Sequence, residues 1–281
     1  MLNYNQLKKF SKERNINQST AIGYESALKQ YTNFHQKSMD ELIQEALKQQ
    51  KQKIPLNDRR IKKRLLDYRS HLLKSKYTPT TTKTYFTKIK TYYKHHNIEI
   101  PSLPNAKYKK TYQTNYLDLP TKEHLKQACD NVAIDLKAII LFMASSGTGK
   151  AETLSLTINH FLEATKKYHQ GGSIQNILKT LSRQKNIVPT FYLKRKKTDK
   201  YYYTYCTPEA TQHIIKYLKT RKNLQPQDKL FDFTQISLLN HFREINDKMN
   251  WGFKGKYRFF RAHTLRKYHA SNIGLSAEYV D

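Results

Sequence analysis

The sequence is poor in cysteine, in long apolar segments and in acidic residues, and each scarcity argues against a class of protein. Its 281 residues include only two cysteines, Cys129 and Cys206. No Cys/His cluster has metal-ligand spacing, which argues against a zinc site or a disulfide framework and favours a reducing environment. The longest apolar run, 138–144, is far too short to span a bilayer, and the first residues lack the apolar core of a signal peptide. We therefore expect a cytoplasmic protein without a membrane-spanning segment.

Acidic residues are few relative to basic ones. The chain has 22 Asp and Glu against 51 Lys and Arg, a formal net charge of +29. The excess is spread over both halves of the chain, as expected if two domains touch one polyanion. This balance indicates nucleic-acid binding, which should weaken steeply with salt because phosphate contacts release counterions. The alternative is a solvated surface, since most of the basic residues are lysine.

The first part of the chain, residues 1–103, predicts a small domain of four helices. Ser19 and Thr20 begin the first, whose apolar positions follow helical spacing. The second runs from about residue 39 to residue 50. Asn57 and Asp58 can cap the third, and the pair 78–79 (Thr-Pro) begins the fourth. Apolar and tyrosine side chains that recur on these helices are Ile22, Tyr24, Leu28, Tyr31, Ile61, Leu65, Leu66, Tyr68, Leu72, Tyr85, Ile89, Tyr92 and Tyr93.

Residues 104–120 lack an apolar period and predict an interdomain linker. Pro104 and Pro120 bound the segment, and proline interrupts regular structure. Its basic residues, Lys107, Lys109 and Lys110, would suit a strap that crosses a DNA backbone. A solvated loop is the alternative.

The remaining part, residues 121–281, predicts a mostly helical domain with a small antiparallel β-sheet. Helices fit 121–130, 133–145, 235–248 and 263–274. In 187–206, two β-branched and aromatic runs flank a polar turn, as in a β-hairpin. A further helix should follow with Thr207 as its N-cap and Pro208 at its first position. The expected fold class is therefore mainly α.

A pair near the end of the sequence, His263 and Arg266, has the spacing that places two side chains on one helix face. Alone, this pair is expected by chance. Its order in the chain adds information: a helical domain, a linker, a helix pair that meets at 145–156, a hairpin with Lys197 at its turn, and then this pair. That order resembles the tyrosine recombinase (phage integrase) family, in particular integrases of archaeal viruses and plasmids. The resemblance implies a four-helix (SAM-like) core-binding domain followed by a catalytic domain.

Cleavage of a DNA phosphodiester without a metal needs a nucleophile, cations on the non-bridging oxygens and an acid for the leaving oxygen. The resemblance implies that two arginines, a hairpin lysine, a histidine and a tyrosine nucleophile meet these needs. A covalent 3′-phosphotyrosine link would store the bond energy, so no cofactor and no metal is expected. The implied partners are duplex DNA with inverted-repeat core (att) sites and further copies of the chain, assembled as a tetramer on DNA.

The resemblance assigns roles residue by residue. Arg266 matches the second catalytic arginine, whose planar fork can hold two phosphate oxygens. His263 matches the histidine for proton transfer and phosphate binding; a packing histidine is the alternative. Lys197 matches the hairpin lysine, the general acid. Which lysine of the hairpin takes this role stays open, because Lys194, Lys196 and Lys200 are neighbours.

Two positions depart from the family pattern. The first arginine stands three residues before a glutamate in the family, and here that residue is Gly149, with Lys150 next to it and Glu152 as the glutamate. Either Lys150 fills the role of the first arginine with a shifted backbone, or this part of the active site is degraded. The replacement is not neutral, because a lysine lacks the bidentate fork of an arginine. Glu152 should be structural and hold the turn. In the family the nucleophilic tyrosine comes further beyond the second arginine than this sequence extends, so we expect a catalytic domain truncated before its nucleophile. Tyr279 is the only tyrosine near the end of the sequence, and its position fits the nucleophile poorly.

The sequence therefore predicts site-specific DNA recombination or integration chemistry of a mobile element, in a chain that we expect to be cleavage-deficient alone. The alternative is a non-catalytic, sequence-specific DNA-binding protein, such as a regulator or decoy of a full-length integrase. A basic RNA-binding protein, with tyrosines that stack on bases, is a third interpretation.

Overall fold

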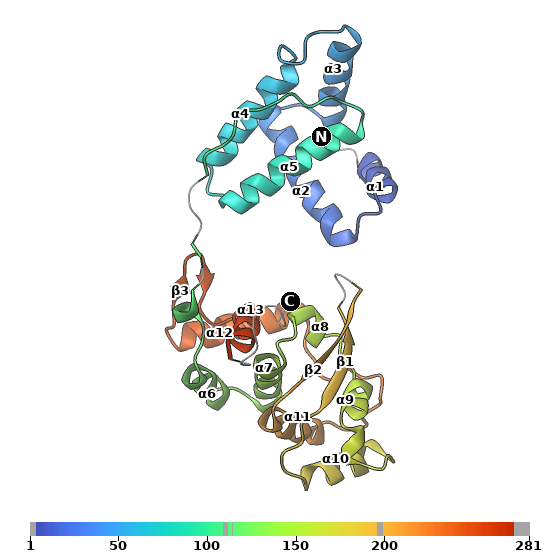
Figure 1. The fold of residues 1–281 in the computed structure, drawn as a ribbon, viewed down its shortest axis with the longest axis vertical. Coiled ribbons are helices and arrows are strands. Elements are labelled where there is room, and N and C mark those ends of the chain that lie inside the picture. The colour runs from blue at the N-terminus through green and yellow to red at the C-terminus, as the bar shows by residue number, and fades with distance from the viewer. Residues whose placement is uncertain (1–3, 109–111, 114, 196–198, 273–281) are drawn as a thin grey trace. The chain divides into compact units, whose positions relative to one another are not determined.

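The computed structural model describes residues 4–108, 112–113, 115–195 and 199–272. The chain divides into two compact units, Met1–Tyr112 and Gln113–Asp281. Figure 1 shows the first in blue to green and the second in green to red. Each unit has its own hydrophobic core, as expected for independent domains.

The first unit is helical. Its helices are α1 (Tyr4–Glu13), α2 (Gln18–His35), α3 (Met39–Lys51), α4 (Arg60–Lys74) and α5 (Pro79–His95). The sequence-based count of four was wrong, because α1 buries only Leu7 and Phe10 and such a short apolar stripe was not recognised.

Side-chain caps fix where three of these helices begin. Asn17, rather than the expected Ser19, caps α2 and accepts from the Thr20 amide. Ser38 forms a reciprocal capping box with Glu41 at the start of α3, and Thr78 caps α5. Such caps satisfy amides that the first helical turn leaves without partners.

The start of α4 differs from the expected one. Asn57 and Asp58 do not cap it; the N-cap residue is Arg59, which makes no side-chain cap. Arg59 is instead 9 % exposed. Its Nε donates to the Ile54 carbonyl at 2.8 Å, and its Nη1 contacts Glu99 at 2.7 Å. This arginine ties the loop before α4 to the segment after α5.

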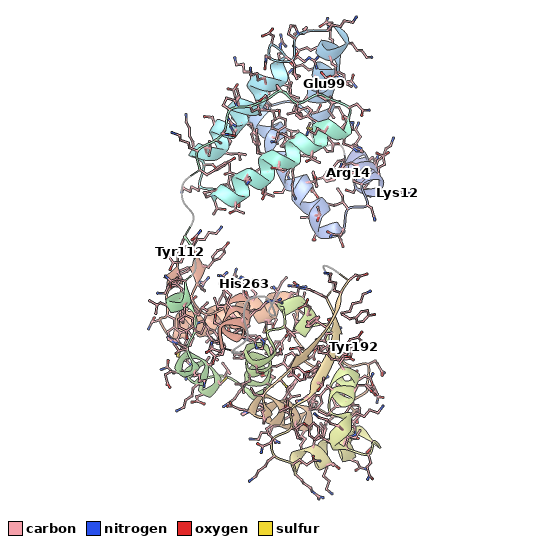
Figure 2. The ribbon with its side chains drawn as sticks, in the orientation of Figure 1. Lys12, Arg14, Glu99, Tyr112, Tyr192 and His263 are labelled. Atoms are coloured by element: carbon pink, nitrogen blue, oxygen red, sulfur yellow. The ribbon has the colours of Figure 1, made fainter. Side chains whose placement is uncertain are left out.

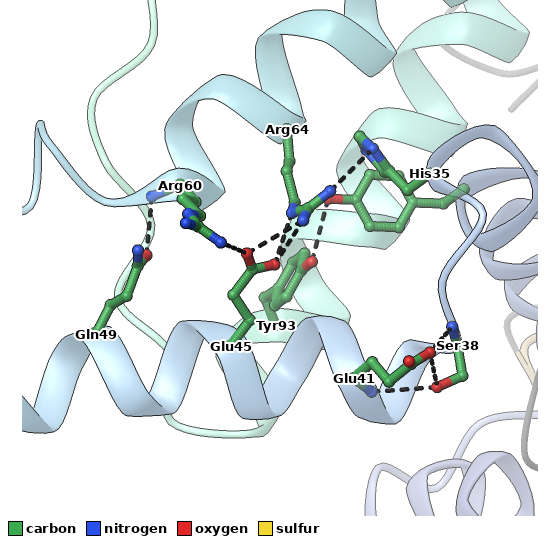
Figure 3. Close-up of polar contacts among 9 residues, drawn as sticks. His35, Ser38, Glu41, Glu45, Gln49, Arg60, Arg64 and Tyr93 are labelled. Atoms are coloured by element: carbon green, nitrogen blue, oxygen red, sulfur yellow. Dashed lines mark hydrogen bonds and ion pairs between the residues drawn. The ribbon is translucent and has the colours of Figure 1, made fainter.

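A charged cluster joins α2, α3 and α4 above a core rich in tyrosine (Figure 3). Glu45 of α3 accepts from Arg60 at 3.0 Å and from Arg64 Nε at 2.8 Å. Arg64 Nη1 also lies 3.4 Å from His35 Nδ1. Beneath it, the buried hydroxyls of Tyr31 and Tyr93 are 3.1 Å apart. Several tyrosines predicted on these helices are therefore core residues.

The second unit is mostly helical and contains two small antiparallel hairpins. In chain order its elements are η1 (Tyr116–Asp118), α6 (Lys122–Asp130), α7 (Ile134–Ser146), α8 (Lys150–Thr153), α9 (Ile158–Ala164), η2 (Lys166–Tyr168), α10 (Ile174–Ser182), β1 (Thr190–Lys194), β2 (Tyr201–Tyr205), α11 (Pro208–Thr220), α12 (Gln235–Lys248), β3 (Phe253–Lys254), β4 (Tyr257–Arg258) and α13 (Ala262–Asn272). The predicted hairpin, the Thr207 cap and four of the predicted helices are confirmed. Helices α9 and α10 and the β3–β4 hairpin were not foreseen.

Helix α7 is the centre of this unit. It is apolar on nearly every face, with Leu136, Ala138, Ile139, Ile140, Phe142 and Met143 all buried. Helices α11 and α13 both pack against it, so α13 lies beside the turn that follows α7. The Thr204 hydroxyl of β2 donates to the Ser146 carbonyl at 2.6 Å and fastens the first hairpin to the same end of α7. The fold is thus mainly α with small antiparallel sheets, as the sequence predicts.

Candidate phosphate-binding site

The turn between α7 and α8 is held by a glycine and a chain of buried hydroxyls. Gly147 ends α7 with a φ of 65°, in the left-handed region, where glycine is favoured. The Ser146 and Thr148 hydroxyl oxygens are 2.9 Å apart, and those of Thr148 and Thr153 are 2.8 Å apart. Thr153 also donates to the Gly149 carbonyl at 3.0 Å. This network fixes the backbone on which the next residues stand.

The Glu152 carboxylate contacts three elements at this turn. Its Oε2 accepts the Gly149 amide at 2.9 Å, which caps α8. The same oxygen lies 3.4 Å from the Tyr202 hydroxyl of β2 and 3.6 Å from Arg266 Nη1 of α13. Glu152 therefore holds the turn, as the resemblance implies, and it also forms an ion pair with Arg266.

Position 149, where the resemblance expects an arginine, adjoins Arg266. A Cβ atom on Gly149 would lie 3.1 Å from Glu152 Oε2 and 3.7 Å from Arg266 Nη1. Lys150 is the first residue of α8 and is half-buried. Within the described residues, no carboxylate pairs with Lys150. The turn and α13 thus bring positions 149, 150 and 266 into one region from distant parts of the sequence.

Helix α13 carries His263 and Arg266, as predicted (Figure 2 labels His263). His263 is exposed. Partial desolvation lowers the pKa of its imidazole, and the positive charges of Arg261, Lys267 and Arg266 lower it further. His263 is therefore neutral at physiological pH, able to donate from one ring nitrogen and accept at the other.

His269 is a residue of this region that sequence reasoning missed. Its ring lies against Gly147, since a Cβ on that glycine would come within 2.3 Å of the His269 Cδ2 atom. Burial lowers the pKa of His269, a hydrogen bond with the Ser145 backbone raises it, and the charge of Arg266 lowers it. The signal was present, because 263, 266 and 269 repeat the three-residue spacing of one helix face.

Five residues weighed in the sequence lie outside the described residues: Lys109 and Lys110 of the linker, Lys196 and Lys197 of the hairpin, and Tyr279. Lys194 pairs with Tyr201 in the β1–β2 register and forms an ion pair with Asp199 at 3.1 Å. Of the alternatives for the hairpin lysine, Lys194 therefore has a carboxylate partner already, and Lys200 is exposed.

The tyrosine that belongs to this cluster is a poor nucleophile. Burial and the neighbouring Glu152 carboxylate raise the pKa of Tyr202 to about 12, against a smaller opposing effect of Arg266. Tyr202 is therefore protonated at neutral pH and donates to Glu152. Among the described residues, no group of three His, Cys, Asp or Glu side chains could hold a metal ion. The arrangement is suited to binding an anion through Arg266, with His263 on the same helix face.

No family model and no curated protein matches the sequence. Solved structures do match it. The Tn1549 transposon integrase in complex with circular intermediate DNA is 14 % identical and covers 98 % of this chain and 88 % of its own, with a TM-score of 0.54. The XerH site-specific recombinase bound to difH substrate is 18 % identical, and the match covers 96 % of this chain and 72 % of XerH, with a TM-score of 0.51. XerA recombinase is 14 % identical, and the match covers 98 % of this chain and 86 % of XerA, with a TM-score of 0.41.

These likenesses establish that the chain has the fold of site-specific recombinases. At such identities they show the fold and not the activity. In the part of the chain that the structure describes, no helix is long and apolar enough to cross a membrane.

Proposed function

We propose that this protein acts on duplex DNA as a member of the tyrosine recombinase family, whose reaction is site-specific cleavage and rejoining through a 3′-phosphotyrosine link. The observation that carries the proposal is the meeting of the 147–152 turn with α13, where Arg266 Nη1 lies 3.6 Å from Glu152 and next to position 149. The recombinase fold and the net charge of +29 support it. An integrase of an archaeal virus or plasmid is the finer assignment that the sequence resemblance favours.

Each site residue has a role in this proposal. Arg266 binds two non-bridging phosphate oxygens through its planar fork. His263, neutral at pH 7, exchanges a hydrogen bond or a proton with the same phosphate. Lys150 adds a point charge at the start of α8, and Lys197 is the general acid for the 5′-oxygen. No metal or cofactor is part of the proposal.

The partner is duplex DNA with inverted-repeat sites, on which copies of the chain assemble as a tetramer. Two of the similar structures are DNA complexes, XerH with its difH substrate and the Tn1549 integrase with circular intermediate DNA. Positive charge in both units suits a protein that contacts DNA with each.

A second candidate function is sequence-specific DNA binding without catalysis, as in a regulator or decoy. Gly149 favours it, because the position has no side chain to hold a phosphate oxygen. In both candidates the site binds phosphate, and they differ in whether a covalent link forms.

Two measurements test the proposal. First, affinity for duplex DNA selected from a random pool is compared with affinity for a scrambled duplex and for single-stranded RNA, over a range of salt. We expect preference for the selected duplex and loss of affinity with salt. Equal affinity for all three would remove the DNA-recombinase assignment.

The second measurement is a suicide-substrate assay with nicked duplex, in which a covalent protein–DNA adduct is sought by denaturing electrophoresis. An adduct that is lost on mutation of a tyrosine establishes the catalytic candidate. Specific binding without an adduct establishes the non-catalytic one. Arg266→Ala should weaken binding in either case, while Arg183→Ala, an exposed arginine at the end of α10, removes the same charge away from the site and serves as the control.

A further inference from the structure

The β3–β4 hairpin, which comes just before α13, forms a rigid base for the start of that helix. Lys254 pairs with Tyr257 across its turn, and Gly255 in that turn has a φ of 60°, a conformation that two-residue hairpin loops require. Asn246 of α12 is fully buried. It donates to the Gly252 carbonyl at 3.1 Å and accepts the Phe260 amide at 2.8 Å. Both ends of the hairpin are therefore attached to α12.

On this base, an arginine lies against an aromatic ring. The Arg261 Cζ atom is 4.2 Å from the centroid of the Tyr257 ring, within the range of a cation–π contact. The Arg261 amide donates to the Thr264 hydroxyl at 3.1 Å, which fixes the first turn of α13. The guanidinium group is thus held at the N-terminal end of the helix that carries His263 and Arg266.

Arg261 lacks an acceptor within the described residues. Its Nε atom is buried without a hydrogen-bond partner there, and no carboxylate in that part of the chain pairs with it. Burial lowers its pKa. By contrast, Arg258 of the same hairpin makes two bonds of 2.8 Å to Asp247. The buried Nε itself is out of reach of an external ligand, but Arg261 as a whole is only half-buried, and its Nη atoms are not among the buried unpaired donors. An external acceptor would therefore meet the guanidinium through its Nη donors.

The surroundings of Arg261 identify the acceptor as an anion. Arg261, Arg266 and Lys267 all act on the imidazole of His263, and all lower its pKa. Arg261 stands two residues before His263, directly ahead of α13, and Arg266 and Lys267 stand three and four residues after it on that helix, the spacings that bring side chains to neighbouring positions. A guanidinium offers planar, paired donors that match phosphate oxygens.

We propose that Arg261 is a DNA phosphate ligand, that the Tyr257 ring positions it, and that it adds a second guanidinium to the basic residues near His263. This inference rests on the proposed function, since the phosphate is that of the DNA backbone. Arg261 would bind one phosphate in addition to the one bound by Arg266.

The test is the salt dependence of duplex affinity for the full chain, measured by fluorescence anisotropy with a short labelled duplex. Each phosphate contact contributes about 0.9 to the slope of log affinity against log salt. Arg261→Ala should therefore reduce the magnitude of the slope by about 0.9. Arg261→Lys should retain the slope but bind more weakly, because a lysine keeps the charge and loses the fork. Tyr257→Leu should lower affinity by a smaller factor than Arg261→Ala, since the arginine remains but is no longer held.

Arg183→Ala is the matched control, because it removes one exposed positive charge outside this group of basic residues. If Arg261→Ala and Arg183→Ala have the same slope, the inference is overturned. It is also overturned if Arg261→Ala lowers the melting temperature and leaves the slope unchanged, because Arg261 would then be structural. A reduced slope for Arg266→Ala alone leaves the proposed function standing without this ligand, whereas wild-type protein without salt-dependent duplex binding removes both. Should Arg261→Ala fail to fold, Arg261→Lys and Tyr257→Leu decide: wild-type affinity in both overturns the inference.

Discussion

Substituting Glu152 with glutamine should strengthen DNA binding and weaken the fold. The carboxylate caps α8 by accepting the Gly149 amide at 2.9 Å, and it also lies 3.6 Å from Arg266 Nη1. Glutamine keeps an oxygen that can accept the amide, but it has no charge. Arg266 would then no longer be shared between a carboxylate and a phosphate, and the incoming phosphate would no longer meet a nearby negative charge.

The size of the effect follows from the geometry. Two unit charges 3.6 Å apart interact by roughly 4–5 kcal/mol at an effective dielectric constant of about 20. The Arg266 side chain is 33 % exposed and that of Glu152 is 13 % exposed, so solvent screening reduces the net interaction to about 1 kcal/mol. That energy corresponds to a roughly fivefold gain in affinity. Replacing a charged acceptor at a helix N-terminus with a neutral one should cost about 0.5–1 kcal/mol of stability.

Anisotropy titrations with duplex DNA and thermal unfolding measure the two effects on the same samples. Glu163→Gln is the control, because Glu163 is exposed in α9, pairs with Lys166 at 3.7 Å and loses the same charge. A gain in affinity for Glu152→Gln that is no larger than the gain for Glu163→Gln would refute the reasoning. A loss of affinity would show that the carboxylate positions Arg266 for DNA rather than competing with it.

Three further substitutions test the scaffold. Burial, and then the Arg64 charge, lower the pKa of His35 from 6.5 to about 4. As pH falls from 6.5 to 4, the unfolded chain therefore takes up this proton before the folded chain does, and the fold should lose stability. His35→Phe should make that loss smaller by about 1–2 kcal/mol, a value discounted for partial exposure, in denaturant titrations at the two pH values. Gly147→Ala should destabilise by about 1–3 kcal/mol in thermal unfolding, because φ is 65° and the new Cβ would meet the His269 ring. Asn246→Ala should cost about 2–3 kcal/mol, because it leaves the Phe260 amide unpaired, and unchanged melting would contradict that role.

Much of the second unit could be predicted because its signals are local. Helix α11 begins with the Thr207 cap and Pro208 that the sequence displays. The strands of the first hairpin alternate, with Phe191 and Leu193 buried and Tyr203 exposed. By contrast, β3 and β4 have two residues each, which is too short for an alternating pattern. Asn246, which fastens that hairpin, is indistinguishable in sequence from a surface asparagine.

The site divides in the same way. His263 and Arg266 share one helix, so their spacing alone places them together. The partner of Arg266, Glu152, and the Tyr202 hydroxyl that contacts Glu152 cannot be predicted in this way, because they come from separate elements that meet only after α13 packs on α7. The resemblance to a known family supplied the link to the 147–152 turn, and the hydroxyl network around Thr148 and Thr153 came only from the structure.

Three arginines around the start of α13 differ in the contacts that their guanidinium groups already make. Those contacts decide how easily each arginine can bind a DNA phosphate. Arg258 would have to break two short bonds to Asp247 before it could bind phosphate. Arg266 has a single, longer contact with Glu152, so it can bind phosphate through its remaining donors. Arg261 has an aromatic ring, which accepts no directed hydrogen bond of the usual strength. A ring restrains a guanidinium without using its donors, so the Nη donors of Arg261 do not have to leave a carboxylate before they bind an anion.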